Sequence, residues 1–269
     1  MIAKREGRHR INRMKNKKTY VLVLPHHDDE IFLVQFLHTL SFTRTEPYEL
    51  IFFYATYDKK SPARIFENRK FLARIVKDNY SIVDFGMDAK ITPRALVAHL
   101  NELESELLKL INSVDSKVTL VFPTLEFGHI DHDVTSLICL RIQNDHIAEK
   151  IGYSTYRLDQ LFDRFPFFRV ATIRIPLLKI MTFEQKKQIF LNIVHGFHEY
   201  RSQRSTWIKL GPSLIFITWF CNSRNWEILN QNEKLRSQLL RENDIVISPI
   251  EYKYFPRWST RNYLVSKKR

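Results

Sequence analysis

The chain has little cysteine, little glycine and no long apolar run. Its two cysteines, Cys139 and Cys221, are too few for a disulfide framework or an all-thiolate metal site, so we expect a reduced, cytoplasmic setting. With only six glycines, a long flexible hinge is not expected. The longest apolar runs, Val21–Leu24 among them, fall far short of the roughly 20 residues that span a bilayer. Disulfide-rich, collagen-like and membrane-spanning classes are therefore excluded.

Acidic residues are also in the minority. The chain has 42 Lys and Arg against 29 Asp and Glu, which gives a formal net charge of +13. Residues 1–18 are strongly basic, and no apolar core follows them to make a secretory signal. We interpret 1–18 as a flexible basic arm before a single domain of residues 19–269. The arm is either a solvated tail or a segment that contacts anionic lipid at the inner membrane face. No fold signature in the sequence indicates nucleic-acid binding.

Strand-like and helix-like segments alternate over the first half of the chain. Tyr20–Leu24 is an uninterrupted apolar run, as in a strand buried on both faces. Arg94–Val114 has leucines at spacings of three and four, which indicates an amphipathic helix. The other predicted strands are 50–55, 81–85 and 117–122, and the other predicted helices are 31–40 and 64–77. This order predicts an α/β, Rossmann-like fold, a mostly parallel sheet with helices on both faces.

The second half of the chain is less regular. Strands are predicted at 169–175 and 245–247, and a helix at 227–241. Thr182 and Gln185 have the spacing of a capping box, which predicts a helix that begins there and ends near Tyr200.

Two polar segments follow predicted strands. The segment after the first strand reads Pro25-His26-His27-Asp28-Asp29-Glu30, and the one after the fourth reads His129-Ile130-Asp131-His132-Asp133. Ligands of open α/β sheets bind beyond the carboxyl ends of the strands, so we expect the two segments to meet there. Together they bring four imidazoles and five carboxylates to one place.

A bound divalent cation accounts for this combination. Crowded carboxylates repel one another and resist ionisation unless a cation lies among them. Imidazole nitrogens with one carboxylate suit Zn²⁺, and three protein ligands leave a position for water. Zinc lowers the pKa of that water from about 15.7 towards about 7. A free carboxylate can then take the water's proton, and a free histidine can stabilise an oxyanion.

The two segments resemble the motifs of the PIG-L/LmbE-like zinc-dependent N-deacetylases. The first motif of that family is Ala-His-Pro-Asp-Asp-Glu and the second is His-x-Asp-His, and the order and spacing match. Weaker similarities are Phe85-Gly86-Met87-Asp88, which resembles the family's Leu-Gly-x-x-Asp, and Lys187 followed by Tyr200-Arg201-Ser202-Gln203, which resembles its Lys…His-x-Ser-Gln. The resemblance covers roughly residues 19–205. It implies hydrolysis of an N-acetyl group, usually on an N-acetylglucosamine unit.

The resemblance also implies roles for individual residues. His26, Asp29 and His132 would hold Zn²⁺, with Fe²⁺ as the alternative metal. Asp28 would be the general base, and His129 would polarise the substrate carbonyl. The remaining residues are expected in supporting roles, Asp131 to orient an imidazole and Glu30 to cap the following helix.

The chain departs from the family pattern in two ways that affect the site. His27 stands where the family has proline, so His27 remains an alternative ligand to His26. Arg64, Arg69 and Arg201 are candidates for contact with the sugar, and the sugar and its carrier are not defined by the sequence.

Other interpretations remain open at this point. One face of the late helix is expected to carry His195, His198 and Glu199. These residues form either a second metal site or an ordinary helix surface. The aromatic clusters at 165–168 and 252–258 pack in a core or lid, or stack on a sugar ring. Two rival functions are a metal-dependent hydrolase of another bond, such as a phosphoester, and a non-catalytic membrane- or nucleic-acid-binding protein that retains the metal site.

Overall fold

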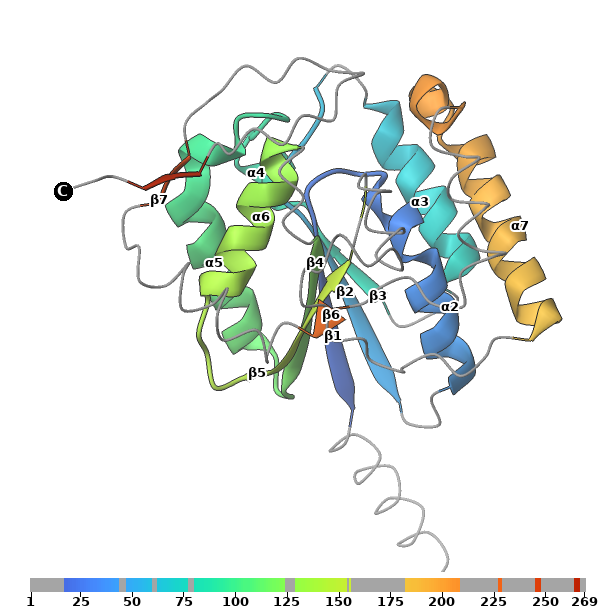
Figure 1. The fold of residues 1–269 in the computed structure, drawn as a ribbon, viewed down its shortest axis with the longest axis horizontal. Coiled ribbons are helices and arrows are strands. Elements are labelled where there is room, and N and C mark those ends of the chain that lie inside the picture. The colour runs from blue at the N-terminus through green and yellow to red at the C-terminus, as the bar shows by residue number, and fades with distance from the viewer. Residues whose placement is uncertain are drawn as a thin grey trace, which may run out of the picture.

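The computed structural model describes residues 17–43, 47–59, 62–76, 80–123, 129–153, 155 and 182–208, and short strands at 227–228, 245–247 and 264–266. A six-stranded sheet forms the centre of the fold in the order β3-β2-β1-β4-β5-β6 (Figure 1). Its strands are β1 (Lys18–Leu24), β2 (Tyr48–Tyr54), β3 (Tyr80–Val83), β4 (Val118–Pro123), β5 (Ile147–Tyr153) and β6 (Glu227–Ile228). All neighbouring strands are parallel except β5 and β6.

Helices cover both faces of the sheet. In Figure 1, α2, α3 and α7 lie on one side of the strands and α5 and α6 on the other. The helical elements are η1 (Asp29–Leu33), α2 (Val34–Thr43), α3 (Ala63–Ile75), α4 (Phe85–Asp88), η2 (Leu96–His99), α5 (Leu100–Ser113), α6 (Ile130–Arg141), α7 (Phe183–Glu199) and η4 (Arg201–Gln203). This arrangement confirms the α/β, Rossmann-like fold. Among the described helices, none has the length and apolar character to cross a membrane.

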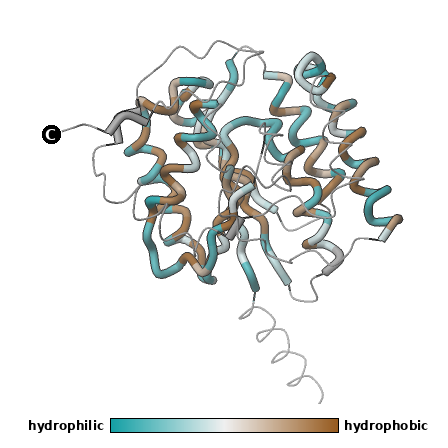
Figure 2. Tube along the Cα trace, in the orientation of Figure 1, coloured by the Kyte–Doolittle hydropathy of each residue, from teal (hydrophilic) through white to brown (hydrophobic). Residues whose placement is uncertain are grey.

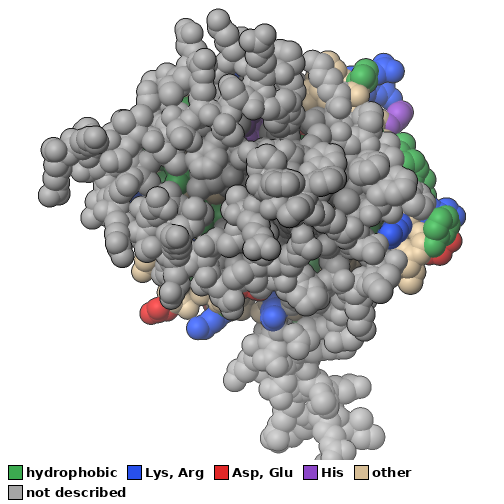
Figure 3. Space-filling view, viewed as in Figure 1, with side chains coloured by type: hydrophobic (Ala, Val, Ile, Leu, Met, Phe, Trp, Pro, Cys, Tyr) green, Lys and Arg blue, Asp and Glu red, His purple; other side chains and the backbone are tan. Residues whose placement is uncertain are grey.

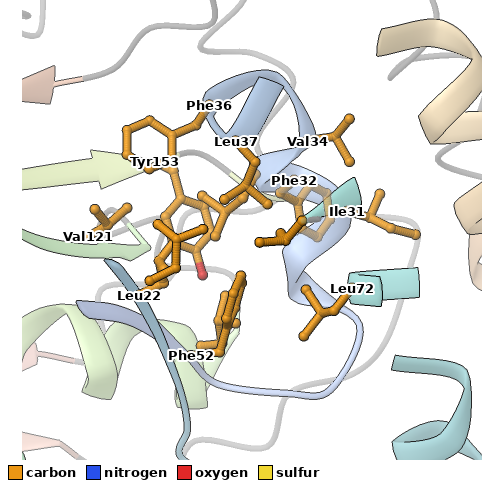
Figure 4. Close-up of a cluster of buried hydrophobic side chains, with 14 of the residues drawn as sticks. Leu22, Ile31, Phe32, Val34, Phe36, Leu37, Phe52, Leu72, Val121 and Tyr153 are labelled. Atoms are coloured by element: carbon orange, nitrogen blue, oxygen red, sulfur yellow. The ribbon is translucent and has the colours of Figure 1, made fainter. Parts of the chain in front are cut away.

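Two apolar layers sandwich the central strand. Leu22 of β1 packs with Phe52 and with residues of α2, α3 and α7 in one cluster, part of which is shown in Figure 4. Val21 and Val23 face the opposite way and pack with leucines of α5. Hydropathy follows the same pattern, with hydrophobic residues concentrated along the central strands (Figure 2). The uninterrupted apolar sequence of β1 thus reflects burial on both faces.

The helix α7 begins with the predicted capping box. The Thr182 side chain accepts a hydrogen bond from the Gln185 backbone N–H, and the Gln185 side chain accepts one from the Thr182 backbone N–H. The helix carries exposed apolar side chains, Phe183, Leu191 and Val194. Figure 3 shows hydrophobic and basic side chains next to one another along the right-hand edge of the molecule.

Three predicted boundaries are wrong. The third strand ends at Val83 rather than at Phe85, which begins α4. The helix predicted from Arg94 begins only at Leu96, because the backbone of Arg94 is left-handed with φ of 72° and cannot continue a right-handed helix.

The third error is Glu227, predicted to begin a helix. Glu227 and Ile228 instead form β6, which pairs with Gly152 and Ile151 at the edge of the sheet. The strand predicted at 245–247 is confirmed as β7 (Ile245–Ile247), paired with β8 (Leu264–Ser266). The arm's residues 1–16, the strand predicted at 169–175, residues 229–241 of the predicted helix and both aromatic clusters lie outside the described residues.

Candidate metal centre

The two polar segments meet at the carboxyl ends of neighbouring strands. β1 and β4 are parallel partners in the middle of the sheet. The loop after β1 leads into η1, and His129 directly precedes α6 after β4. The sheet continues from β1 to β2 and β3 on one side, and from β4 to β5 on the other side. The two segments therefore lie at the topological switch point, where the order of the strands reverses.

Three side chains present ligand atoms to a shared point. The Asp29 Oδ2 atom lies 3.3 Å from His26 Nδ1 and 3.4 Å from His132 Nε2. All three atoms lie within 4.8 Å of one another, and the residues are buried. Two ligands each about 2.0–2.1 Å from a tetrahedral zinc ion lie about 3.3–3.4 Å apart. The donor set and its spacing therefore fit a zinc-like cation.

The third imidazole of the cluster belongs to His129. Its ring centroid lies 4.8 Å from that of His26 and 4.9 Å from that of His132, in edge-to-face orientations. His129 precedes the first helical residue of α6, whereas His132 lies within its first turn. The helix start therefore places both rings beside His26.

Asp131 orients one of these imidazoles. Its Oδ2 atom lies 3.1 Å from His26 Nε2 and accepts a hydrogen bond of 2.7 Å from the Arg94 backbone N–H. This contact leaves His26 Nδ1 directed toward Asp29. His26 and Asp131 also form a second group capable of binding a metal, together with His129.

Thr155 supports His132 in a similar way and was not among the residues predicted from the sequence. The Thr155 hydroxyl and His132 Nδ1 form a hydrogen bond of 3.0 Å, with Thr155 buried just beyond the end of β5. The bond directs His132 Nε2 toward Asp29. The one sequence feature that could have indicated Thr155 is its position just after β5, the strand that pairs with β4.

Burial of the acids changes their protonation in the absence of a cation. Burial raises the pKa of Asp29, an effect that His26 partly offsets and Asp28 reinforces. Burial also raises the pKa of Glu30 well above its usual range. Burial would raise the pKa of Asp131 too, but the hydrogen bond and attraction of His26 outweigh it and lower the value. A cation near Asp29 would favour its ionised, ligating form.

The imidazoles respond to the same environment. Burial lowers the pKa of His26, but Asp29 and Asp131 outweigh it and raise the value to about 10. Burial and the nearby His26 lower the pKa of His129 to about 3. Burial, followed by His129 and His26, lowers the pKa of His132 well below its usual value. Neutral imidazole is the form that binds metals.

Asp28 lies next to the candidate ligands without belonging to either metal-capable group. Its Oδ1 atom lies 3.7 Å from the Arg64 guanidinium, which also lies 3.7 Å from the Asp58 carboxylate. Asp28 and Arg64 are both largely buried, with side chains 8% and 12% exposed. Of the three candidate arginines, Arg64 is therefore the one in contact with the segment after β1.

His27 and Glu30 face away from the candidate ligands. His27 Nε2 lies 2.6 Å from Asp84 Oδ1, so the structure directs this imidazole to the end of β3 instead of toward Asp29. Glu30 accepts a hydrogen bond of 2.7 Å from Asn68 Nδ2 of α3. Glu30 lies in the first turn of η1, whose N-cap residue Asp28 makes no side-chain capping bond, and the Glu30 carboxylate also contacts α3.

The other two candidate arginines are more exposed. Arg69 lies 3.9 Å from Asp84, and its side chain is 58% exposed. Arg201 is exposed in η4, and its neighbour Ser202 donates backbone and hydroxyl hydrogen bonds to Glu67 of α3. Glu67 was not predicted from the sequence to link α3 with η4, although it lies three residues after Arg64.

The metal-capable groups among the described residues are confined to this cluster. His195, proposed as part of a second site on α7, instead forms a hydrogen bond of 2.8 Å with the Arg74 guanidinium of α3. That contact favours the ordinary helix-surface interpretation of His195.

Comparison with known proteins finds similarity in structure alone. No protein-family model and no curated protein sequence matches the chain. A deacetylase from the biosynthesis pathway of teicoplanin has a TM-score of 0.50 at 12% identity, covering 78% of this chain and 95% of that one. A deacetylase of an antimicrobial pseudoaglycone has a TM-score of 0.52 at 13% identity, covering 77% and 94%. The chain therefore has the fold of these solved deacetylases.

Proposed function

We propose that this chain is a metal-dependent hydrolase that removes the N-acetyl group from an N-acetylated amino sugar, a GlcNAc-type unit of a glycoconjugate or polysaccharide precursor. The observation that carries the proposal is the spacing of His26, Asp29 and His132, two contacts of 3.3 and 3.4 Å that match the edge of a zinc tetrahedron. Both structural neighbours are deacetylases, which supports the same class of reaction.

The three residues would hold Zn²⁺, with Fe²⁺ as the alternative. When bound, such a cation lowers the pKa of a water and polarises a carbonyl oxygen. Asp131 holds His26 through Nε2, and Thr155 holds His132 through Nδ1, so both rings keep a nitrogen directed toward Asp29. Such partners fix the orientation of metal-binding imidazoles.

Asp28 and His129 carry the proton and charge changes in this proposal. Asp28 accepts a proton from the water that attacks the acetamide carbon. It returns that proton to the nitrogen as the carbon–nitrogen bond breaks, which gives acetate and a free amine. His129 donates a hydrogen bond to the carbonyl oxygen as negative charge develops there. The Arg64 guanidinium lies 3.7 Å from Asp28 Oδ1.

Substrate contact by Arg64, Arg69 and Arg201 remains part of the proposal. Arg64 is the best placed, because it reaches Asp28 while Arg69 contacts Asp84. Contact of the basic arm with anionic lipid is likewise a proposal.

A release screen tests the function directly. The purified chain, loaded with Zn²⁺, is incubated with N-acetylated sugars, nucleotide sugars and lipid-linked sugars, and acetate and free amine are quantified with and without a chelator. Chelator-sensitive acetate release from at least one sugar is expected, and His132→Gln should abolish it. Phosphate release from phosphoesters in place of acetate release would identify a hydrolase of another bond. Zinc binding with neither product would indicate a non-catalytic binding protein.

A further inference from the structure

The loop that carries His26 and Asp29 has one short hydrogen bond of its own, 2.9 Å from the His26 backbone N–H to Asp29 Oδ2. Its backbone–backbone bonds, from Asp29 N to His26 O and from Ile31 N to Asp28 O, are both 3.4 Å long, at the weak end of the range. None of these bonds involves the His27 side chain, which contacts Asp84 instead. Contacts with other elements therefore hold the middle of the loop in position.

A group of buried or largely buried polar side chains lies behind this loop. We call the group the polar support; its members are His27, Glu30, Tyr54, Asn68 and Asp84. The His27 ring stacks on the Tyr54 ring with centroids 4.1 Å apart and planes 11° apart. Asn68 Nδ2 donates a bond of 2.7 Å to Glu30 and one of 2.6 Å to the Tyr54 hydroxyl. The group joins the loop to β2, α3 and the end of β3.

The shortest contact of the loop within this group is the one between His27 and Asp84. Its length is 2.6 Å, and the His27 side chain is 3% exposed. Asp84 also lies 3.9 Å from Arg69, so the carboxylate is held between α3 and the loop. His27 stands between His26 and Asp28 in sequence, so any rotation of its backbone moves the candidate ligand and the candidate base together.

We propose that His27 and Asp84 form a positioning pair that fixes the loop so that His26 and Asp29 present their ligand atoms to one metal ion. This inference rests on the proposed function for the identity of those ligands. The pair supplies by hydrogen bonding a restraint that proline, with its locked φ angle, would supply covalently at this position. Neither residue touches the metal or the substrate in this proposal.

Metal binding by the full-length protein tests the pair. His27→Leu removes the hydrogen bond, whereas His27→Gln retains an amide donor. We expect Zn²⁺, measured in competition with a chromophoric chelator, to bind about tenfold more weakly to His27→Leu and to remain close to wild type in His27→Gln. The visible absorption spectrum of the Co²⁺-loaded protein should change in His27→Leu, which a purely structural role would not produce.

A matched control and a second variant complete the design. The exposed pair His99 and Glu102 has a similar contact of 2.8 Å outside the loop, so His99→Leu should leave Zn²⁺ affinity and the Co²⁺ spectrum unchanged. Asp84→Ala removes the same bond from the other side and replaces His27→Leu as the test variant if His27→Leu does not fold.

The outcomes separate the inference from the proposed function. Wild-type affinity and spectrum in folded His27→Leu or Asp84→Ala would overturn the positioning pair while leaving the metal site intact. Equal weakening in His27→Gln and His27→Leu would overturn the role of the hydrogen bond. A wild-type chain that binds neither Zn²⁺ nor Co²⁺ would overturn the proposed function, and the pair with it.

Discussion

At the scale of single residues, the two neighbouring acids Asp28 and Asp29 have different surroundings. Asp29 Oδ2 lies between two imidazole nitrogens, while Asp28 lies against Arg64. The same side-chain chemistry therefore supports two roles, one as ligand and one as base. The sequence placed both acids after a strand, and the structure supplies the difference between them.

Replacing Asp28 separates these roles. Asp28→Asn should retain Zn²⁺ affinity and lose about 10²- to 10⁴-fold in turnover, because the amide cannot accept the water's proton. Zinc titration and acetate release measure the two effects on the same protein. The exposed Asp115→Asn serves as the control and should change neither. Turnover equal to wild type in Asp28→Asn would exclude Asp28 as the base.

His38 of α2 makes stability depend on pH away from the site. Burial lowers its pKa from 6.5 to about 4. Between those pH values the unfolded chain binds a proton at His38 that the folded chain does not. The free energy of unfolding should therefore fall as the pH drops through this window, by up to about 1.4 kcal/mol per pH unit from this residue.

Urea unfolding across that pH window measures the effect. The slope of unfolding free energy against pH should be smaller in His38→Gln than in the wild type, because the buried titrating group is gone. The difference between the two proteins isolates His38 from other buried histidines. Parallel slopes would show that His38 titrates alike in the folded and unfolded chains.

At the scale of elements, close packing at the sheet edge supports the loop after β1. A Cβ atom at Gly86 of α4 would lie 2.4 Å from the Thr56 backbone. The Thr56 backbone N–H and hydroxyl both donate to the Pro25 carbonyl, at 3.0 and 2.7 Å. Gly86 therefore lets α4 approach the segment that holds the start of the loop in place.

Gly86→Ala should consequently destabilise the chain by about 1–3 kcal/mol, since backbone has to move to admit the methyl group. Denaturant unfolding measures this. Gly196→Ala in α7 should cost less, because its new Cβ would meet side chains, Ile31 Cδ1 at 2.9 Å and Phe71 Cε2 at 3.0 Å, instead of backbone. Equal stability of Gly86→Ala and wild type would mean that α4 is free to shift away from Thr56.

The element boundaries show what local sequence could and could not predict. β1 was predictable because burial on both faces requires an apolar residue at every position. The start of the helix after Pro93 was not predictable. Arg94 has a left-handed backbone, and its N–H donates a hydrogen bond to Asp131, which lies 37 residues away in the sequence. The strand at Glu227 was missed for the same reason, since it depends on pairing with β5.

The candidate site followed the same division. Residue types and the carboxyl-end rule for strands were enough to predict that the two polar segments meet. The choice of His26, Asp29 and His132 within them came from the resemblance to the deacetylase motifs. The direction of His27 was not predictable, because Asp84 and Tyr54, which hold it, come from two other strands or their ends. The role of Thr155 was not predictable either, because a single threonine belongs to no recognisable motif.

At the scale of the whole molecule, the candidate metal centre lies between the two halves of the sheet, beyond β1 and β4. A cation bound there would stabilise the folded chain, because the unfolded chain does not hold β1 and β4 residues together. Zn²⁺ at about 100 times its dissociation constant should raise the free energy of unfolding by about 2.7 kcal/mol. Denaturant unfolding with added Zn²⁺, or with a chelator, measures the difference.

His132→Gln provides the comparison for this prediction. It removes one ligand, so Zn²⁺ should stabilise the variant far less than the wild type. His146→Gln, in the loop before β5, removes a histidine that belongs to neither metal-capable group and should respond like the wild type. Equal stabilisation of His132→Gln and wild type would place the bound zinc elsewhere on the chain.

The candidate ligands lie about a hundred positions apart in the chain, in segments that follow β1 and β4, two strands that become neighbours only in the finished sheet. During synthesis, a ribosome would release His26 and Asp29 long before His132. A nascent chain therefore lacks the complete chelate until β4 and the start of α6 have emerged and docked beside β1. Binding of the ion would then follow assembly of the sheet and would not nucleate its folding.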